Sequence, residues 1–493
     1  MNRRFASYGN QFGGAPAQQE QLTPELADVA RLAQQGVQML VRAARGGQPP
    51  KPQGLNKILL DHFGEQAGQL DVVDEAWPTY DAVNVQAGLD AWLSVEGREH
   101  ELVGVIGFQH SVFGLAELLT ADPYRGMPVG PGNVARTNLP SGPGGQVRPC
   151  VECGLYLVTE GEHRSALLFR ASNIHGQPTT TVQLVDTTPG RAAVVAAELR
   201  DLVVEHNVYR GQVLSFGTEV FGHGQAILNF HRRPETTAAD LILDPGVLEQ
   251  VRRQVVVVAQ HSEQLLAAGQ HLKRGLLLYG PPGVGKTHTV RYLTSSLPDT
   301  TVIELTGRAL HMVEQACSVA RTLAPAMIVI EDVDLIAEDR GMHPGHHPML
   351  FQLLNEMDGL AEDADVLFVL TTNRPDLLEP ALAARPGRVD QAVELTLPDR
   401  AARQQLFALY RARLEVDTSR LDAVLDGTDG VTASFIKELL RRAALLAAEA
   451  GGESPANLHV SADQLDAALI ELLDTRNTMT RVLLGGVAEQ QLN

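Results

Sequence analysis

A glycine-rich segment between a predicted strand and a predicted helix constrains the fold most. It reads Gly280-Pro281-Pro282-Gly283-Val284-Gly285-Lys286-Thr287, after the apolar run Leu276–Tyr279 and before the helical pattern Thr289–Leu293. In this setting, glycines let backbone N–H groups turn towards a phosphate at a helix N-terminus. Lys286 then faces the β- and γ-phosphates, and the Thr287 hydroxyl can bind Mg²⁺. The flanking patterns argue against a chance turn, so we expect an α/β nucleotide-binding fold, with His288 closing the binding segment.

A second apolar run ends in carboxylates. Met327–Ile330 predicts a buried strand, and Glu331 and Asp332 follow it directly. Ligands of open α/β sheets bind at the carboxyl ends of the strands. One carboxylate there can order the Mg²⁺ shell while the other orients attacking water. The alternative is a pair of solvated acids at a strand end.

Two further segments carry polar groups suited to phosphoryl transfer. The strand pattern of residues 365–370 ends in Thr371-Thr372-Asn373, where an amide could hold the attacking water. Arg385 and Arg388 lie on a Pro-Gly turn. Arginine at such a position suits developing phosphoryl charge and is often supplied by a neighbouring subunit.

Together these segments resemble the AAA clade of the AAA+ ATPases, from about Leu241 to Ala450. The resemblance implies a P-loop NTPase parallel sheet with a C-terminal helical lid at residues 398–478. It also implies Mg²⁺-dependent ATP hydrolysis in a homohexameric ring, with ATP between subunits. The residues that carry it are Gly280–Thr287 as Walker A, Ile328–Asp334 as Walker B, Asn373 as sensor 1, and Arg385 and Arg388 as arginine fingers.

The chain departs from the family pattern at several positions. The family usually has Asp-Glu in Walker B, so by alignment Glu331 takes the Mg²⁺ role and Asp332 the catalytic role. The interval Gly307–Pro325 lacks the aromatic residue of the family's pore loop. In the sensor-2 segment Phe435 replaces an acidic residue, so a contact of Ser434 to nucleotide is only suspected.

These features favour an ATPase that remodels, chaperones or unfolds protein substrates. Because the pore-loop aromatic is missing, a non-threading assembly or translocation ATPase is an alternative function. A nucleotide-gated scaffold with little turnover is a further alternative, and a DNA-remodelling ATPase is another. The substrate or partner is expected to bind residues 23–224.

The remaining pattern predicts the domain order. We expect a flexible tail (1–22), an α+β N-terminal domain (23–235), an α/β ATPase subdomain (236–397), a helical lid (398–478) and a C-terminal tail (479–493). The N-terminal domain should contain a helix from Thr23, a hairpin at 155–169 and a helix at 191–206. The Pro- and Gly-rich segment Asp122–Pro149 is expected to be a long loop, and residues 225–240 a linker.

Composition excludes several classes of protein. The chain of 493 residues has 40 Lys and Arg against 59 Asp and Glu, a net charge of −19. Nucleic-acid binding is not expected, because phosphate neutralisation needs clustered basic residues. No apolar run is long enough for a membrane span, and no signal peptide is expected. With 3 cysteines, the chain lacks a disulfide framework and is predicted to be cytoplasmic.

Two smaller motifs stay open. Cys150 and Cys153 form a lone Cys-x-x-Cys that could be a reduced pair, part of a zinc site, or a redox pair. The segment His343–Pro348 holds three histidines and could be a metal site, although its prolines and glycine favour a solvated loop.

Overall fold

The computed structural model describes residues 54–108, 113–119, 129–171, 179–218, 226–334, 348–359, 361, 364–376, 389–451 and 458–474. The chain divides into two compact units, Met1–Gly54 and Leu55–Asn493. Three predicted segments lie outside the described residues: the N-terminal tail, the helix from Thr23 and the C-terminal tail. No helix in the described part of the chain is both long and apolar enough to cross a membrane.

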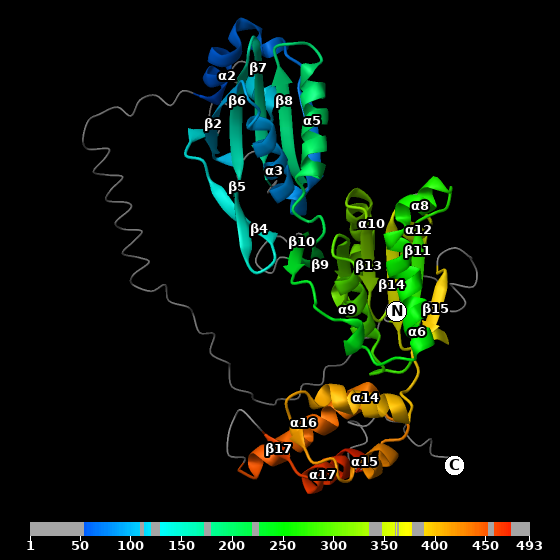
Figure 1. Ribbon diagram of the computed structural model, residues 1–493. Coiled ribbons are helices and arrows are strands. Elements are labelled where there is room, and N and C mark those ends of the chain that lie inside the picture. Colours follow the sequence, from blue (N-terminus) through cyan, green and yellow to red (C-terminus); the bar gives the residue numbers. More distant parts are fainter. Residues whose placement is uncertain are drawn as a thin grey trace, which may run out of the picture. The chain divides into compact units, whose positions relative to one another are not determined.

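The first sheet has six strands in the order β1-β8-β7-β6-β2-β3, and all of its pairs are antiparallel. Its central strands are buried on both sides, because helices cover each face. The helices α3 and α5 pack on one face, and α2 and α4 pack on the other (Figure 1). The strands are β1 (Val73–Pro78), β2 (Arg98–Ile106), β3 (Gly130–Gly132), β6 (Cys153–Glu160), β7 (His163–Arg170) and β8 (Thr179–Asp186). The helices are α2 (Leu55–Phe63), η1 (Gly64–Gln69), η2 (Thr79–Asp81), α3 (Ala82–Leu93), α4 (Leu115–Leu119) and α5 (Arg191–Glu205).

The predicted hairpin and helix of this region are confirmed, but the predicted long loop is wrong over much of its length. Strands β4 (Arg136–Gly142) and β5 (Gln146–Val151) pair into a separate two-stranded ribbon. Gly144 and Gly145 form its tip with φ of 76° and 82°. The glycines therefore mark a tight turn between strands, since such φ values are accessible mainly to glycine.

The second sheet has seven strands in the order β10-β9-β12-β13-β14-β11-β15. All neighbours run parallel except β10, which is antiparallel to β9. Every residue of β13 and β14 is buried, as expected for parallel strands covered on both faces. The strands are β9 (Val213–Thr218), β10 (Ala226–His231), β11 (Arg274–Tyr279), β12 (Thr301–Leu305), β13 (Ala326–Ile330), β14 (Val366–Thr372) and β15 (Gln391–Glu394).

Helices cover both faces of this sheet. On one face, α6 and α9 close a core that contains Val251 and Leu293. On the other face, η6, α10 and α12 close a second core. The helices are η4 (Ala238–Asp240), α6 (Pro245–Arg252), η5 (Arg253–Val257), α7 (Val258–Gln260), α8 (Ser262–Ala267), α9 (Lys286–Ser296), η6 (Gly307–Met312), α10 (Val313–Thr322) and α12 (Pro348–Asp358).

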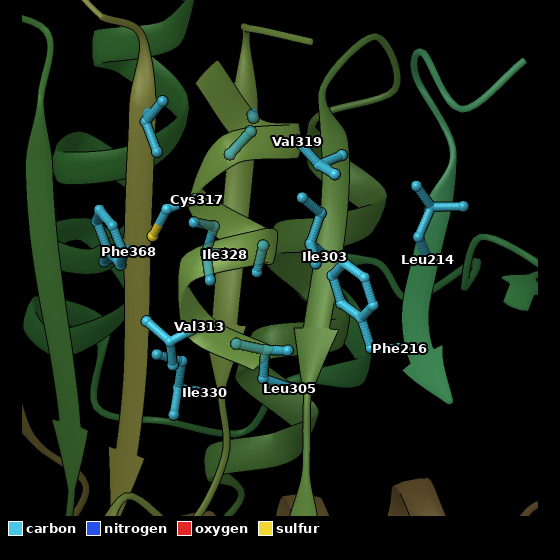
Figure 2. Close-up of a cluster of buried hydrophobic side chains, with 14 of the residues drawn as sticks. Leu214, Phe216, Ile303, Leu305, Val313, Cys317, Val319, Ile328, Ile330 and Phe368 are labelled. Atoms are coloured by element: carbon cyan, nitrogen blue, oxygen red, sulfur yellow. The ribbon is translucent and has the colours of Figure 1, made fainter. Parts of the chain in front are cut away.

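The hairpin β9–β10 differs from expectation. The sequence pattern predicts residues 213–218 in the N-terminal domain and residues 226–231 in a linker, but β9 pairs with β12 of the second sheet. Leu214 and Phe216 of β9 lie in one apolar layer with Ile303, Ile328 and Phe368 (Figure 2). The expected boundary at residue 235 therefore divides residues that one hydrogen-bonded sheet holds together.

The C-terminal region is helical, as predicted. Its core includes Phe435 and Leu439, which lie on the longest of the described helices. A short parallel ribbon joins two of its connections. The elements are α14 (Arg400–Arg411), β16 (Glu415–Val416), α15 (Leu421–Gly427), α16 (Ala433–Glu449), β17 (His459–Val460) and α17 (Ala462–Leu473).

Candidate nucleotide-binding site

The glycine-rich loop connects β11 to α9, as the sequence predicts. Gly280, Gly283 and Gly285 have φ of 144°, 83° and 111°, values that side chains rarely allow. A Cβ atom on Gly280 would lie 2.2 Å from the carbonyl oxygen of Leu395. The loop can therefore form only with glycine at this position, and its backbone leads into the N-terminus of α9.

Lys286 lies on the first turn of α9 with 8% of its surface exposed. Its Nζ donates to the carbonyl oxygens of Gly280 at 2.7 Å and Pro281 at 2.9 Å, and to Oδ1 of Asn373 at 2.7 Å. Burial lowers the pKa of Lys286, and the nearby carboxylates of Asp332 and Asp334 oppose that shift. The ammonium group is held by neutral oxygen acceptors. A charged phosphate oxygen is a stronger acceptor and can take their place.

Asp332 and Asn373 meet at the ends of β13 and β14. Nδ2 of Asn373 donates to Oδ1 of Asp332 at 3.4 Å. The backbone N–H of Asp332 donates to Oγ1 of Thr371 at 3.1 Å. Asp332 has φ of 51°, in the left-handed region that aspartate and asparagine adopt more readily than most other side chains. Two of the predicted catalytic groups are thus adjacent.

Asp334 was missed by the sequence reasoning as a site residue. It is buried, and Oδ1 accepts from Oγ1 of Thr372 at 2.8 Å and from the N–H of Asn373 at 3.3 Å. These bonds hold the backbone that carries the Asn373 amide. The only signal was its place as the last acid of the Glu331–Asp334 cluster.

Glu331 and Thr287 are the predicted Mg²⁺ ligands. Glu331 is half-buried directly after β13, and Thr287 is exposed on the first turn of α9. Among the described residues, no three His, Cys, Asp or Glu side chains are grouped to hold a metal ion by themselves. One hydroxyl and one carboxylate fit Mg²⁺, because this ion keeps water and phosphate oxygens as its other ligands.

A cavity of about 400 Å³ adjoins the loop at Val284. Such a volume lies in the range of small-ligand pockets. Its walls come from the start of α6, the connection between β15 and α14, the helix α14 itself and the N-terminus of α16. They include Ile242, Leu243, Val284, Thr396, Leu406 and Ala433.

The lid contacts the loop at Gly283. Ser434 donates to the carbonyl oxygen of Gly283 through its N–H at 3.2 Å and its hydroxyl at 3.4 Å. Thr432 caps α16, with its hydroxyl accepting from the N–H of Phe435 at 3.4 Å. The suspected Ser434 contact is therefore to the loop that is expected to hold phosphate.

Of the other candidate residues, some lie outside the described part of the chain and one lies on α9. Arg385, Arg388 and residues 343–347 lie outside the described residues. His288 is half-buried on α9 and lies near Asp240, whose pKa is lowered mainly by hydrogen bonds from Thr237 and slightly by this histidine.

The Cys-x-x-Cys pair is buried in the first sheet and its ribbon. Burial raises the pKa of Cys150 to about 11 and that of Cys153 to about 12. Thiols with such pKa values are poor nucleophiles at neutral pH. These environments favour the reduced-pair interpretation.

The interval Gly307–Pro325 forms η6 and α10. Leu310 and Val313 are buried against the sheet, with 3% and 2% exposed. The segment that should carry a pore loop is thus a packed helical connection over these residues.

Comparison with known proteins identifies the same region. Residues 276–397 match the family described as "ATPase family associated with various cellular activities (AAA)". The ATP-dependent zinc metalloprotease FtsH 3 of Sphaerobacter thermophilus is 33% identical over 252 residues, covering 48% of this chain and 50% of that protein. The proteasome-activating nucleotidase of Pyrococcus horikoshii is 31% identical over 229 residues, covering 44% and 57%. The chain spans about half the length of the curated relatives it matches.

Proposed function

We propose, from the premise that this chain contains an ATPase domain of the AAA family, that it hydrolyses ATP to remodel, chaperone or unfold protein substrates. The observation that carries the proposal is the convergence of Lys286, Asn373 and Asp332, which three separate sequence segments supply. The names of the relatives, a metalloprotease and a proteasome activator, favour a protein substrate.

Each residue has a defined task in this proposal. The loop from Gly280 to Thr287, followed by His288, binds the phosphates, and Lys286 exchanges its carbonyl acceptors for phosphate oxygens. The cavity beside Val284 takes the nucleobase. Thr287 and Glu331 would hold Mg²⁺, which supplies charge neutralisation when bound.

The Asp332 carboxylate accepts a hydrogen bond from the attacking water, and Asn373 holds that water in line with the phosphate. In the structure the Asn373 amide already donates towards the Asp332 carboxylate, so a water bound between them would have both partners in place. Asp is one methylene shorter than the family's usual Glu, which is expected to make hydrolysis slow.

The proposed assembly is a homohexameric ring. Arg385 and Arg388 of one subunit would stabilise transition-state charge in the neighbour's site. Residues 23–224 would recognise the protein partner. We further propose a cytoplasmic location and no nucleic-acid or membrane partners. The low cysteine content and the net charge of −19 support this part of the proposal.

A non-threading assembly or translocation ATPase is the second candidate. The packed η6–α10 segment favours it, because Leu310 and Val313 anchor the residues that would otherwise reach a central pore. A scaffold with little turnover differs from both in its rate of phosphate release.

The test measures phosphate release and the unfolding of a tagged fluorescent reporter by the full chain. Hydrolysis that Lys286→Ala abolishes supports the ATPase, and its absence in the wild-type protein overturns it in favour of the scaffold. Reporter unfolding supports the threading function. Robust hydrolysis without unfolding supports the non-threading candidate.

A further inference from the structure

Polar side chains on β9 and β12 interrupt an otherwise apolar face of the second sheet. On the face covered by α9, Val213 of β9 and Val302 of β12 are buried in one core. Two residues further along each strand, on the same face, stand Ser215 and Glu304. These two residues are direct partners in the parallel pairing of β9 and β12.

Three charged side chains influence the Glu304 carboxylate. His231 of β10 and Arg291 of α9 both favour its ionised form, whereas Glu331 after β13 opposes it. Burial is the largest effect, and it raises the pKa of Glu304. His231 is itself fixed, because its Nε2 lies 2.7 Å from Oγ of Ser215.

The backbone brings Glu304 close to Glu331. Strands β12 and β13 pair in register up to Leu305 and Ile330. The N–H of Glu331 then donates to the carbonyl oxygen of Leu305 at 3.4 Å, the residue after Glu304. Among the described residues, no hydrogen bond or ion pair engages the Glu304 carboxylate.

An unpaired, half-buried carboxylate is costly to keep at such a place. A glutamine would fill similar space without a charge. Cation binding nearby would offset the cost of burying the Glu304 carboxylate. A second carboxylate beside Glu331 makes the electrostatic potential there more negative and so favours a cation.

We propose that Glu304 is a positioning residue of the magnesium site, whose charge strengthens cation binding at Glu331 and Thr287, while Arg291 limits that charge. The inference rests on the proposed function, in which Glu331 and Thr287 hold Mg²⁺. It predicts opposite effects for Glu304→Gln and Arg291→Gln, each of which removes one charge and keeps much of the side-chain shape.

The experiment measures Mn²⁺ binding, by electron paramagnetic resonance, to the full chain saturated with a slowly hydrolysed ATP analogue at pH 8. Mn²⁺ replaces Mg²⁺ because both prefer octahedral oxygen ligands. Glu304→Gln should weaken Mn²⁺ binding about three- to tenfold, and Arg291→Gln should strengthen it by a smaller factor. The Mg²⁺ concentration for half-maximal hydrolysis should shift in the same directions, and Glu304→Asp should restore most of the affinity.

Nucleotide affinity in excess EDTA separates positioning from a structural role, since the proposal expects it to stay unchanged in Glu304→Gln. A loss of that affinity equal to the loss of Mn²⁺ binding overturns the inference. Unchanged Mn²⁺ binding in Glu304→Gln also overturns it and leaves the ATPase proposal intact. Should Glu304→Gln fail to fold, weaker or unchanged Mn²⁺ binding by Arg291→Gln overturns it. A wild-type protein that binds nucleotide but no Mn²⁺ overturns both the metal assignment and this inference.

Discussion

The ammonium group of Lys286 and the side-chain carbonyl of Asn373 are joined by a hydrogen bond of 2.7 Å, between α9 and the end of β14. The bond orients the Asn373 amide, because Oδ1 faces the lysine and Nδ2 faces Asp332. The residue expected to hold attacking water is therefore aligned by the residue expected to bind phosphate.

Asn373→Ala should lower kcat about 10- to 100-fold, because the water loses one positioning group. KM for ATP should change less, since Lys286 keeps its two loop carbonyls. Steady-state phosphate release measures both constants. Asn138→Ala on the exposed β4 is the matched control, and equal kcat in the two variants would contradict the assignment.

Asp332→Asn should reduce kcat by about 100-fold or more while ATP still binds, because the amide cannot take up a proton from water. Single-turnover hydrolysis together with a nucleotide-binding titration checks both parts. Glu331→Gln is the comparison, and it should raise the Mg²⁺ requirement. Unchanged phosphate release by Asp332→Asn would show that the catalytic carboxylate lies elsewhere.

Gly283→Ala should weaken nucleotide binding and loosen the lid. Its new Cβ would lie 2.9 Å from Oγ1 of Thr432 and 3.0 Å from Oγ of Ser434, at a φ of 83°. Gly430→Ala is the control, because φ there is 72° and nothing lies within 4 Å of the added atom. Both variants carry backbone strain of about 1 kcal/mol, so only the excess loss of ATP affinity in Gly283→Ala reports the lid contact.

Asp81 should contribute a loss of stability to the N-terminal sheet as pH rises from about 4 to about 6. Burial raises the pKa of Asp81 from 3.8 to about 6, against a hydrogen bond from Asn84. In that window this carboxyl keeps its proton in the folded protein and loses it in the unfolded chain, so its contribution to the free energy of unfolding falls as pH rises. Asp81→Asn should remove this slope and stabilise at pH 7 by about 1–3 kcal/mol.

Tryptophan fluorescence during urea unfolding measures this effect locally, since both tryptophans, Trp77 and Trp92, belong to this region. A slope retained in Asp81→Asn would assign the pH dependence to another group.

The three cysteines should react slowly with a thiol reagent at pH 7 until the chain unfolds. Burial raises the pKa of Cys150 to about 11 and those of Cys153 and Cys317 to about 12, so very little thiolate is present. Disulfide-exchange titration with and without denaturant checks this. Stoichiometric zinc by metal analysis, or a fast-reacting Cys150 in the native protein, would contradict the reduced-pair interpretation.

Local sequence pattern predicted the strands that carry the site. The runs that became β11, β13 and β14 are apolar because both of their faces are covered, and the polar residues after them could be placed at one sheet edge. The role of Asp334 was not predictable, since its partners Thr372 and Asn373 lie 38 and 39 residues away.

The ribbon β4–β5 and the hairpin β9–β10 escaped prediction for a different reason. Their residues have the composition of loops and short strands, and only pairing with distant segments decides their state. Nothing local to Val213 indicates that it will pair with Val302. Arg385 and Arg388 remain predictions from the resemblance.

The pairing of β9 with β12 decides where this protein can be cut. A truncated ATPase that begins at residue 236, the boundary read from the sequence, lacks β9 and β10 and exposes the backbone edge of β12. It also uncovers the apolar surface that Leu214 and Phe216 bury. An open edge beside an apolar patch recruits further strands, so that fragment should aggregate, whereas one that keeps residues from Tyr209 onward retains the sealing hairpin.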